Sequence, residues 1–295
     1  MPRIIDYSID SEQDGLKIFT FLKYRNGYST KLIRTIKNTE NGIMLNGSPA
    51  RTIDRLKSGD SLTVSIPDDR ETVEYTECDL DIIYEDDDIL VINKSPFMAM
   101  HPTHNHQGDT LANAVAAYLS KKGKPCTFRA VGRLDKGTSG LVVCALNPLA
   151  ACKLSGKVKK EYAAVVSGDP GDEGTVNVPI YRPDPMKTLR ACSEELGVES
   201  AVTHWRVLER KNGSSLVALK LETGRTHQIR VHMAYIGHPL AGDNMYGDFM
   251  TEFGHQLLHC GKVCFTHPVS GEKCEFTAPA PKEFTAAGYE NIPDF

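Results

Sequence analysis

Residues 132–140 read GRLDKGTSG, and the chain on either side of this stretch decides the expected fold. Two apolar runs flank it, FRAV at 128–131 and LVVCAL at 141–146, and each has the length of a buried strand. The glycines allow the backbone to turn sharply or to approach closely. Asp135 thus lies in a loop between the cationic side chains of Arg133 and Lys136. A carboxylate in this setting suits acid/base or nucleophilic chemistry. The alternative is an ordinary turn whose aspartate caps backbone N–H groups.

A second motif, at 223–247, reads TGRTHQIRVHMAYIGHPLAGDNMYG and is dense in Arg, His and Gly. The two stretches together resemble the signature motifs of the RluA-type pseudouridine synthases. The matching patterns are RLD followed by TSG in the first stretch, and TGR, HQIR, H, GHP, GD and YG in the second. The resemblance extends from about residue 80 to the C-terminus. Two long motifs in the same order are far more specific than one glycine-rich loop.

Composition agrees with an ordinary enzyme. The 295 residues are 40% apolar and 24% charged, as in globular proteins, and can form two domains. No apolar run reaches the ~18 residues of a membrane span, and the N-terminus lacks the apolar centre of a signal peptide. We therefore expect a cytoplasmic protein, and we separately expect a monomer. The eight cysteines form no CxxC pair, which predicts reduced, mostly buried thiols and no structural zinc.

The net charge of −4 hides an uneven distribution. Residues 15–57 hold nine Lys and Arg against two acids, whereas residues 68–88 hold eleven acids against Arg70 alone. A basic block followed by an acidic one indicates a small polyanion-binding unit joined to the rest by a solvated linker. We therefore predict an N-terminal domain at 1–75 and a catalytic domain at 76–295.

The N-terminal unit, from about Asp14 to Pro67, predicts helix, helix, strand and strand. The second helix opens at Ser29, and GIMLNG and SLTVSIP alternate as half-buried strands do. This order resembles the S-four-like RNA-binding module, although the usual SR opening of its second helix reads Ser29-Thr30 here. Lys31 and Arg34 fall three apart on one side of that helix and can face a phosphate backbone together. The alternative is a small α/β unit whose charges only keep it in solution.

The catalytic domain should be an α+β body on a mixed, mostly antiparallel sheet. Asn212-Gly213 supplies the tight turn of a hairpin, and the strands near the C-terminus lack intervening helices. Other expected elements are a strand at 89–92, a helix capped by Asp109 or Thr110 and ending at Gly123, a helix after Asn147, a strand at 161–168, an irregular segment at 170–200 and a helix from about Thr226 to Gly237.

Two groups of residues invite a metal site. Asp86, Asp87 and Asp88 are consecutive, so their side chains point apart in extended chain, and a solvated turn is the better interpretation. His101, His104 and His106 lack a partner cluster with ligand spacing. We therefore predict no metal.

The resemblance implies a reaction without a cofactor. The bond from ribose C1′ to uracil N1 breaks, the base turns, and it is rejoined through C5. One carboxylate is needed, and by resemblance it is Asp135. Arg230 of HQIR matches the position that pairs with this aspartate. Lys160-Glu161-Tyr162 resembles a K-x-Y motif of the family, whose tyrosine lines the pocket.

The partner implied by the resemblance is RNA, either ribosomal or transfer RNA, and the N-terminal unit favours ribosomal RNA. Position 132 is often His in the family and is Gly here. The residues predicted to contact substrate are Arg133, Thr138, Arg225, His227 and Leu258, with Lys31 and Arg34 in the N-terminal unit.

Two other classes of function remain open. One is an RNA-binding protein on an inactive synthase fold, which predicts loss of Asp135, Tyr162 or Arg230, although all three are present. The other is a metal-dependent hydrolase built on the histidines and aspartates, whose activity a chelator would abolish.

Overall fold

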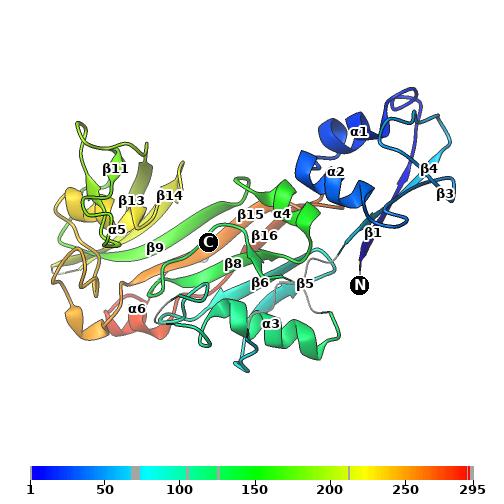
Figure 1. Ribbon diagram of the computed structural model, residues 1–295. Helices are drawn as coiled ribbons and strands as arrows, with labels where there is room; N and C mark the ends of the chain where they lie inside the picture. Colours follow the sequence, from blue (N-terminus) through cyan, green and yellow to red (C-terminus); the bar gives the residue numbers. More distant parts are fainter. Residues whose placement is uncertain are drawn as a thin grey trace.

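The computed structural model describes residues 2–67, 74–103, 106–124, 127–211, 213–290 and 292. An N-terminal four-stranded sheet has the order β1-β4-β2-β3, and a larger sheet has the path β10-β13-β14-β9-β15-β8-β6-β5 with β16 and β7 alongside. Figure 1 shows the N-terminal sheet and its helices at one end of an elongated molecule, with the larger sheet running away from them. No helix in these ranges is long and apolar enough to cross a membrane.

The N-terminal unit contains the predicted elements and two more strands. Its elements are β1 (Arg3–Ser8), α1 (Ile18–Thr20), a π-helical turn (Phe21–Arg25), α2 (Thr30–Lys37), β2 (Ile43–Leu45), β3 (Ser48–Pro49) and β4 (Ser61–Ile66). Strand β1 pairs antiparallel with β4, so the unit begins near residue 3 and the expected start at Asp14 is wrong. The predicted boundary at residue 75 falls between the two sheets and stays a prediction.

Helix α2 separates apolar from basic residues, as the sequence indicates. The Ser29 side chain accepts a hydrogen bond from the backbone N–H of Leu32, which caps the helix. Leu32, Ile33 and Ile36 are buried, whereas Lys31, Arg34 and Lys37 are exposed. The basic side chains therefore project into solvent. Their role in RNA binding, and the identity of the unit as S-four-like, stay predictions.

The larger sheet is mixed and mostly antiparallel, which confirms the α+β prediction. Its strands are β5 (Asp81–Glu85), β6 (Ile89–Lys94), β7 (Arg129–Ala130), β8 (Ser139–Ala145), β9 (Lys159–Ser167), β10 (Glu173–Asn177), β13 (Val202–Lys211), β14 (Ser214–Leu221), β15 (Leu258–Thr266) and β16 (Lys273–Thr277). Among these described strands only β8 and β15 pair in parallel. That pairing brings the end of the 132–140 loop to the middle of the sheet.

Helices and short segments complete the domain. They are α3 (Leu111–Lys121), α4 (Pro148–Leu154), the hairpin strands β11 (Ile180–Tyr181) and β12 (Ala191–Cys192), α5 (Gln228–Tyr235), a 3₁₀ turn (Thr251–Phe253) and α6 (Lys282–Ala286). Thr110 caps α3. Every residue of β8 is buried, and the apolar core joins β6, β8 and β9 to Leu111, Val115 and Leu119 of α3.

The segment 170–200 is more regular than expected. Strand β10 joins the edge of the larger sheet against β13, and β11 pairs with β12. The many Gly, Pro and acidic residues obscured these short strands, because such residues are usually depleted from strands. The predicted hairpin is present, with Lys211 opposite Ser214, although residue 212 lies outside the described ranges.

The acidic stretch around Asp88 is not a solvated turn. Asp88 is buried and accepts hydrogen bonds from Arg3 Nε and Nη2, at 2.9 and 2.8 Å, and from Asn147 Nδ2 at 2.7 Å. Neighbouring side chains do point apart, since Asp87 is exposed, but the burial of Asp88 could not be predicted because its partner Arg3 belongs to a strand that the sequence analysis missed. This partly buried ion pair connects the N-terminal unit to the larger domain.

The cysteines differ from expectation in their burial. Of the seven that the structure describes, Cys144 and Cys260 are buried, Cys78 is exposed and the other four are half-buried. The expectation of mostly buried thiols is therefore wrong. Cys126 lies outside the described residues.

Candidate active site

The 132–140 loop connects β7 to β8 and turns at Asp135, whose carbonyl accepts a hydrogen bond from Thr138 N at 3.0 Å. Gly140 then has a φ of +107°, and a Cβ there would lie 2.3 Å from the carbonyl oxygen of Cys260 on β15. Only glycine allows the two backbones to approach so closely. The strand pairing therefore fixes the end of the loop, and with it the position of Asp135.

Arg230 lies on α5 and joins two carboxylates. Its Nη1 donates to Asp135 Oδ2 at 3.2 Å, while Nε and Nη2 donate to the two oxygens of Asp243 at 2.6 and 2.8 Å. The bidentate partner of this arginine is thus Asp243, whereas Asp135 receives a single hydrogen bond from it. Asp243 belongs to the GD motif, but the sequence alone gave it no role.

The charges of this cluster are strongly coupled. Burial opposes the charge of Arg230, but the hydrogen bonds and negative charges of Asp243 and Asp135 outweigh it and raise the pKa of the guanidinium. The side chain of Asp243 is 1% exposed and that of Asp135 is 15% exposed. One carboxylate therefore neutralises the buried arginine, and the other faces the cleft.

His227 lies next to the same carboxylate. Tyr246 Oη accepts a hydrogen bond from Arg190 N at 2.9 Å and lies 2.8 Å from His227 Nδ1. The Asp135 carboxylate beside Nε2 repels a lone pair and favours an N–H there, so in the neutral imidazole the tyrosine hydroxyl donates to Nδ1. The neutral imidazole then carries its proton on Nε2, which faces Asp135 Oδ2 at 3.9 Å. Burial lowers the pKa of His227, and Asp135 opposes this shift. We conclude that a neutral histidine presents an N–H group to Asp135.

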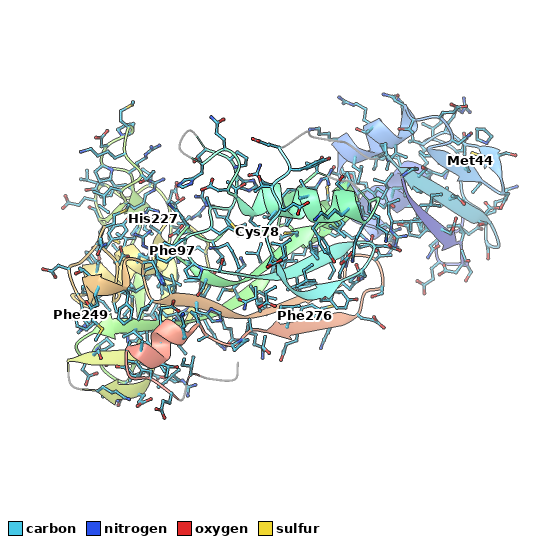
Figure 2. The ribbon with its side chains drawn as sticks, turned by 90° about the horizontal axis from the view of Figure 1, so that it is seen from below. Met44, Cys78, Phe97, His227, Phe249 and Phe276 are labelled. Atoms are coloured by element: carbon cyan, nitrogen blue, oxygen red, sulfur yellow. The ribbon has the colours of Figure 1, made fainter. Side chains whose placement is uncertain are left out.

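The cleft beside Asp135 brings together the residues predicted in the catalytic domain. Its lining consists of Arg133, Leu134, Asp135, Thr138, Tyr162, Leu221, Arg225, His227, Gln228, Ile229, Arg230 and Leu258. Lys31 and Arg34 do not lie there, because α2 is at the other end of the molecule from α5 (Figure 1). In Figure 2, His227 and Met44 of the N-terminal unit mark these two ends.

Tyr162 contributes an aromatic wall. It lies on β9 and is 6% exposed, and burial raises its pKa well above the usual value. The hydroxyl therefore stays protonated near neutral pH. Leu258, on the neighbouring strand β15, is 5% exposed and lies in the same cleft. These two side chains form an apolar surface beside a charged one.

Two side chains that the sequence analysis missed form hydrogen bonds to the 132–140 loop and hold it in place. Lys94 is 1% exposed, and its Nζ donates to the carbonyl oxygens of Ser95, Met98 and Lys136, at 2.8, 3.0 and 3.1 Å. Burial lowers the pKa of Lys94 to about 7, against the attraction of Asp135. Gln256 Nε2 donates to the hydroxyl of Thr138 at 2.9 Å. A lysine directly after a buried strand was the only available signal for this role.

The residues considered for metal binding are engaged by protein groups. Lys136 Nζ lies 3.0 Å from His106 Nε2, where a cation would have to bind, and His104 lies outside the described residues. Among the described parts of the chain, one acidic group with a histidine is close enough for a shared ion, namely Asp86, Asp88 and His267. Asp88 pairs with Arg3, and Asp86 Oδ2 accepts from His267 Nε2 at 2.9 Å.

Residues 88–235 match the family described as RNA pseudouridylate synthase. The chain belongs to this family, and its relatives place it among the RluA-type enzymes. It is therefore an isomerase that acts on RNA.

Individual relatives cover most of the chain. An uncharacterized RNA pseudouridine synthase of Bacillus subtilis (strain 168), YjbO, is 40% identical over 88% of this chain and 94% of its own length. The ribosomal large subunit pseudouridine synthase D of Vibrio cholerae is 38% identical over 78% of this chain and 76% of its own length. Among solved structures, human RNA pseudouridylate synthase domain containing 1 has a TM-score of 0.57 and 28% identity, covering 70% of this chain and 86% of that one.

Proposed function

We propose that the protein converts uridine to pseudouridine in large-subunit ribosomal RNA, with Asp135 as the reacting carboxylate and without a cofactor. The observation that carries the proposal is the placement of Asp135 in a cleft, held by the buried Arg230 and faced by Tyr162. The ribosomal substrate is supported by relatives from Vibrio cholerae and Neisseria meningitidis that are named ribosomal large subunit pseudouridine synthase D.

The reaction moves atoms within one nucleotide. The C1′–N1 bond breaks, the uracil turns within the cleft, a C1′–C5 bond forms, and the proton leaves C5 while N1 gains one. A single carboxylate can attack C1′, attack the base or remove a ribose proton. All three routes use the carboxylate of Asp135, and the guanidinium of Arg230 places a positive charge next to it, at 3.2 Å.

The base must leave the RNA stack to reach Asp135. Such flipping costs a few kcal/mol, which contacts with the extruded base have to offset. We propose that Tyr162 and Leu258 contact the faces of the uracil, because both side chains line the cleft beside Asp135. The Tyr162 hydroxyl stays protonated and can contact a polar atom of the turned base. Arg133 and Arg225 line the same opening, and their positive charges favour a polyanion there.

A map of pseudouridines in total cellular RNA, with and without the gene, tests the proposal. We expect at least one site in large-subunit ribosomal RNA to disappear and to return with a plasmid copy. Disappearance of a site in transfer RNA alone would contradict the ribosomal substrate but not the activity. An unchanged map would contradict the proposal as a whole.

A further inference from the structure

Lys160 lies directly beside the catalytic loop. It precedes Tyr162 by two residues on β9, so both side chains leave the strand on the same face. A Cβ atom placed on Gly132 would lie 3.4 Å from Lys160 Nζ and 3.8 Å from its Cε. The ammonium group therefore lies in the space into which a side chain at position 132 would project.

The backbone at Gly132 favours this arrangement. Its φ is +77°, a left-handed conformation that glycine adopts more readily than other residues do. Gly132 and Arg133 are both exposed, so this part of the loop is accessible to a ligand. The lysine thus places its charge at the opening of the cleft, and not inside it.

Lys160 has no acidic partner among the described residues. Its neighbour Glu161 pairs with Lys220 at 3.1 Å, on the other face of the strand. The positive charge of Lys160 acts instead on the thiol of Cys260, where it partly offsets the burial that raises the pKa of that group to about 11. Lys160 is half-buried and has no counter-ion among the described residues. An anionic ligand would therefore be favoured beside its ammonium group.

We propose that Lys160 binds a backbone phosphate of the RNA next to the flipped uridine. When a base enters the cleft, the sugar and its phosphates must stay at the opening, where the ammonium lies. A lysine binds phosphate as a compact point charge on a flexible stem. This phosphate site rests on the proposed function in one respect, namely that a uridine of an RNA enters this cleft. It does not depend on which RNA is modified.

The competing explanation is that Lys160 merely covers the loop backbone at Gly132. The two explanations differ in the salt dependence of RNA binding, because only a phosphate contact releases a counterion. The probe is a large-subunit ribosomal RNA transcript made in vitro, which contains no pseudouridine. The variants are Lys160→Met, Lys160→Gln and Lys160→Arg. Lys159→Met is the matched control, because Lys159 is exposed and leaves the strand on the opposite face.

For Lys160→Met and Lys160→Gln we expect affinity to fall roughly ten-fold at moderate salt. The slope of log affinity against log salt should shrink by about 0.7 to 1. The single-turnover rate at saturating RNA should stay close to that of the unaltered protein. Lys160→Arg should restore the slope, and Lys159→Met should leave affinity and slope unchanged. Gly132→Asn tolerates the positive φ and puts a side chain against the ammonium, so it should reproduce the loss.

If folded Lys160→Met and Lys160→Gln show the same slope of log affinity against log salt as the unaltered protein, the phosphate site is wrong. This result would overturn the site even where the unaltered protein forms pseudouridine. An equal loss with Lys159→Met would overturn it as well, because the effect would then be one of net charge. If the unaltered protein binds the transcript but forms no pseudouridine, the ribosomal substrate is wrong. A smaller slope in the Lys160 variants would still support the phosphate site.

Discussion

Arg230 divides its donors between two carboxylates, and this division suits the role that we propose for Asp135. Asp243 occupies Nε and Nη2 of the arginine, which leaves Nη1 for Asp135. Asp135 therefore receives charge stabilisation at Oδ2, while Oδ1 accepts no hydrogen bond from the described residues. A bidentate pair with Asp135 would have engaged both oxygens. The division of roles keeps one oxygen of Asp135 available to the substrate.

Asp243→Asn tests this division at the scale of one residue. The variant leaves Arg230 without its bidentate partner, so we expect the guanidinium to engage both oxygens of Asp135. Turnover should fall by at least about 100-fold while RNA binding is kept, and stability should fall by roughly 3 kcal/mol because a buried ion pair is broken. Single-turnover kinetics and urea unfolding measure the two effects. Asp248→Asn, an exposed change five residues away, is the control.

Full activity in Asp243→Asn would contradict the division of roles. Arg230→Lys provides a second comparison, because it keeps the charge but loses the fork of donors. It should retain more activity than Arg230→Met, and either change combined with Asp135→Asn should cost little more than Asp135→Asn alone.

At this scale, the sequence predicted residues that belong to motifs and missed residues that only a partner in space defines. Asp135, Tyr162 and Arg230 stand in matching motifs, and the structure brings all three into one cleft. Asp243 stands in the GD motif but was given no role, because the motif alone does not show that its carboxylate binds Arg230. Lys94 was given none either, because the carbonyl group of Lys136 that it binds is 42 residues away in sequence. Their residue types alone do not distinguish them from surface charges.

The parallel pairing of β8 with β15 connects the catalytic loop to the centre of the sheet. Ser139 Oγ lies 3.0 Å from His259 Nδ1, and His259 Nε2 lies 3.1 Å from the carbonyl oxygen of Ala278. The carbonyl can only accept, so Nε2 carries the proton and Ser139 donates to Nδ1. Burial lowers the pKa of His259 to about 4. The two strands are thus joined by a neutral histidine.

This histidine makes stability depend on pH. Its pKa is about 4 in the native state and 6.5 in the reference state, so the unfolded chain binds the extra proton between these values. The contribution of His259 is therefore fully present above pH 6.5 and is lost as pH falls towards 4. We expect a loss of roughly 3 kcal/mol across this range, measured by urea unfolding. His259→Gln keeps a donor and an acceptor but cannot titrate.

The buried His232 also has a lowered pKa, so it adds its own pH dependence to the stability. His232 is present in both proteins, so the difference between the unfolding free energies of the unaltered protein and of His259→Gln isolates the effect of His259. The advantage of the unaltered protein should shrink as the pH falls. A difference that stays constant between pH 7.5 and 4.5 would contradict the neutral histidine.

Among the elements, long periodic segments were predicted well and short pairings poorly. The buried runs around β6 and β8 and the amphipathic α2 gave strong local signals. Strand β1 was missed because its only strand partner, β4, lies some fifty residues further on, and pairing at such distance leaves no local pattern. The short β11 and β12 are stabilised by their surroundings in the fold and not by their own composition.

The basic helix α2 and the helix α5, which carries Arg230 of the cleft, lie at opposite ends of the molecule (Figure 1). The N-terminal unit is fixed to the larger domain, since Leu149 belongs to its apolar cluster and Arg3 pairs with the buried Asp88. Deleting residues 1–75 would therefore leave Asp88 buried without its partner. Changes of charge on α2 test the role of the unit without this damage.

Replacing Lys31, Arg34 and Lys37 together with Gln should weaken RNA binding and leave the chemistry alone. Three fewer phosphate contacts should reduce the salt slope by about 2 to 3. Single-turnover rates at saturating RNA should stay nearly intact, because α2 is far from the cleft. Fluorescence anisotropy at several salt concentrations provides the measurement. Binding as tight as that of the unaltered protein would show that the basic face serves solubility alone.

The central claim is that Asp135 is the reacting carboxylate of a pseudouridine synthase. The most direct measurement is pseudouridine formation by purified Asp135→Asn, on total RNA from cells that lack the gene. We predict that the unaltered protein restores the missing site, whereas Asp135→Asn still binds the RNA and forms no detectable pseudouridine. If Asp135 only capped its loop, asparagine would serve nearly as well, at a cost of about 1 kcal/mol in stability. A fully active Asp135→Asn enzyme would therefore contradict the account.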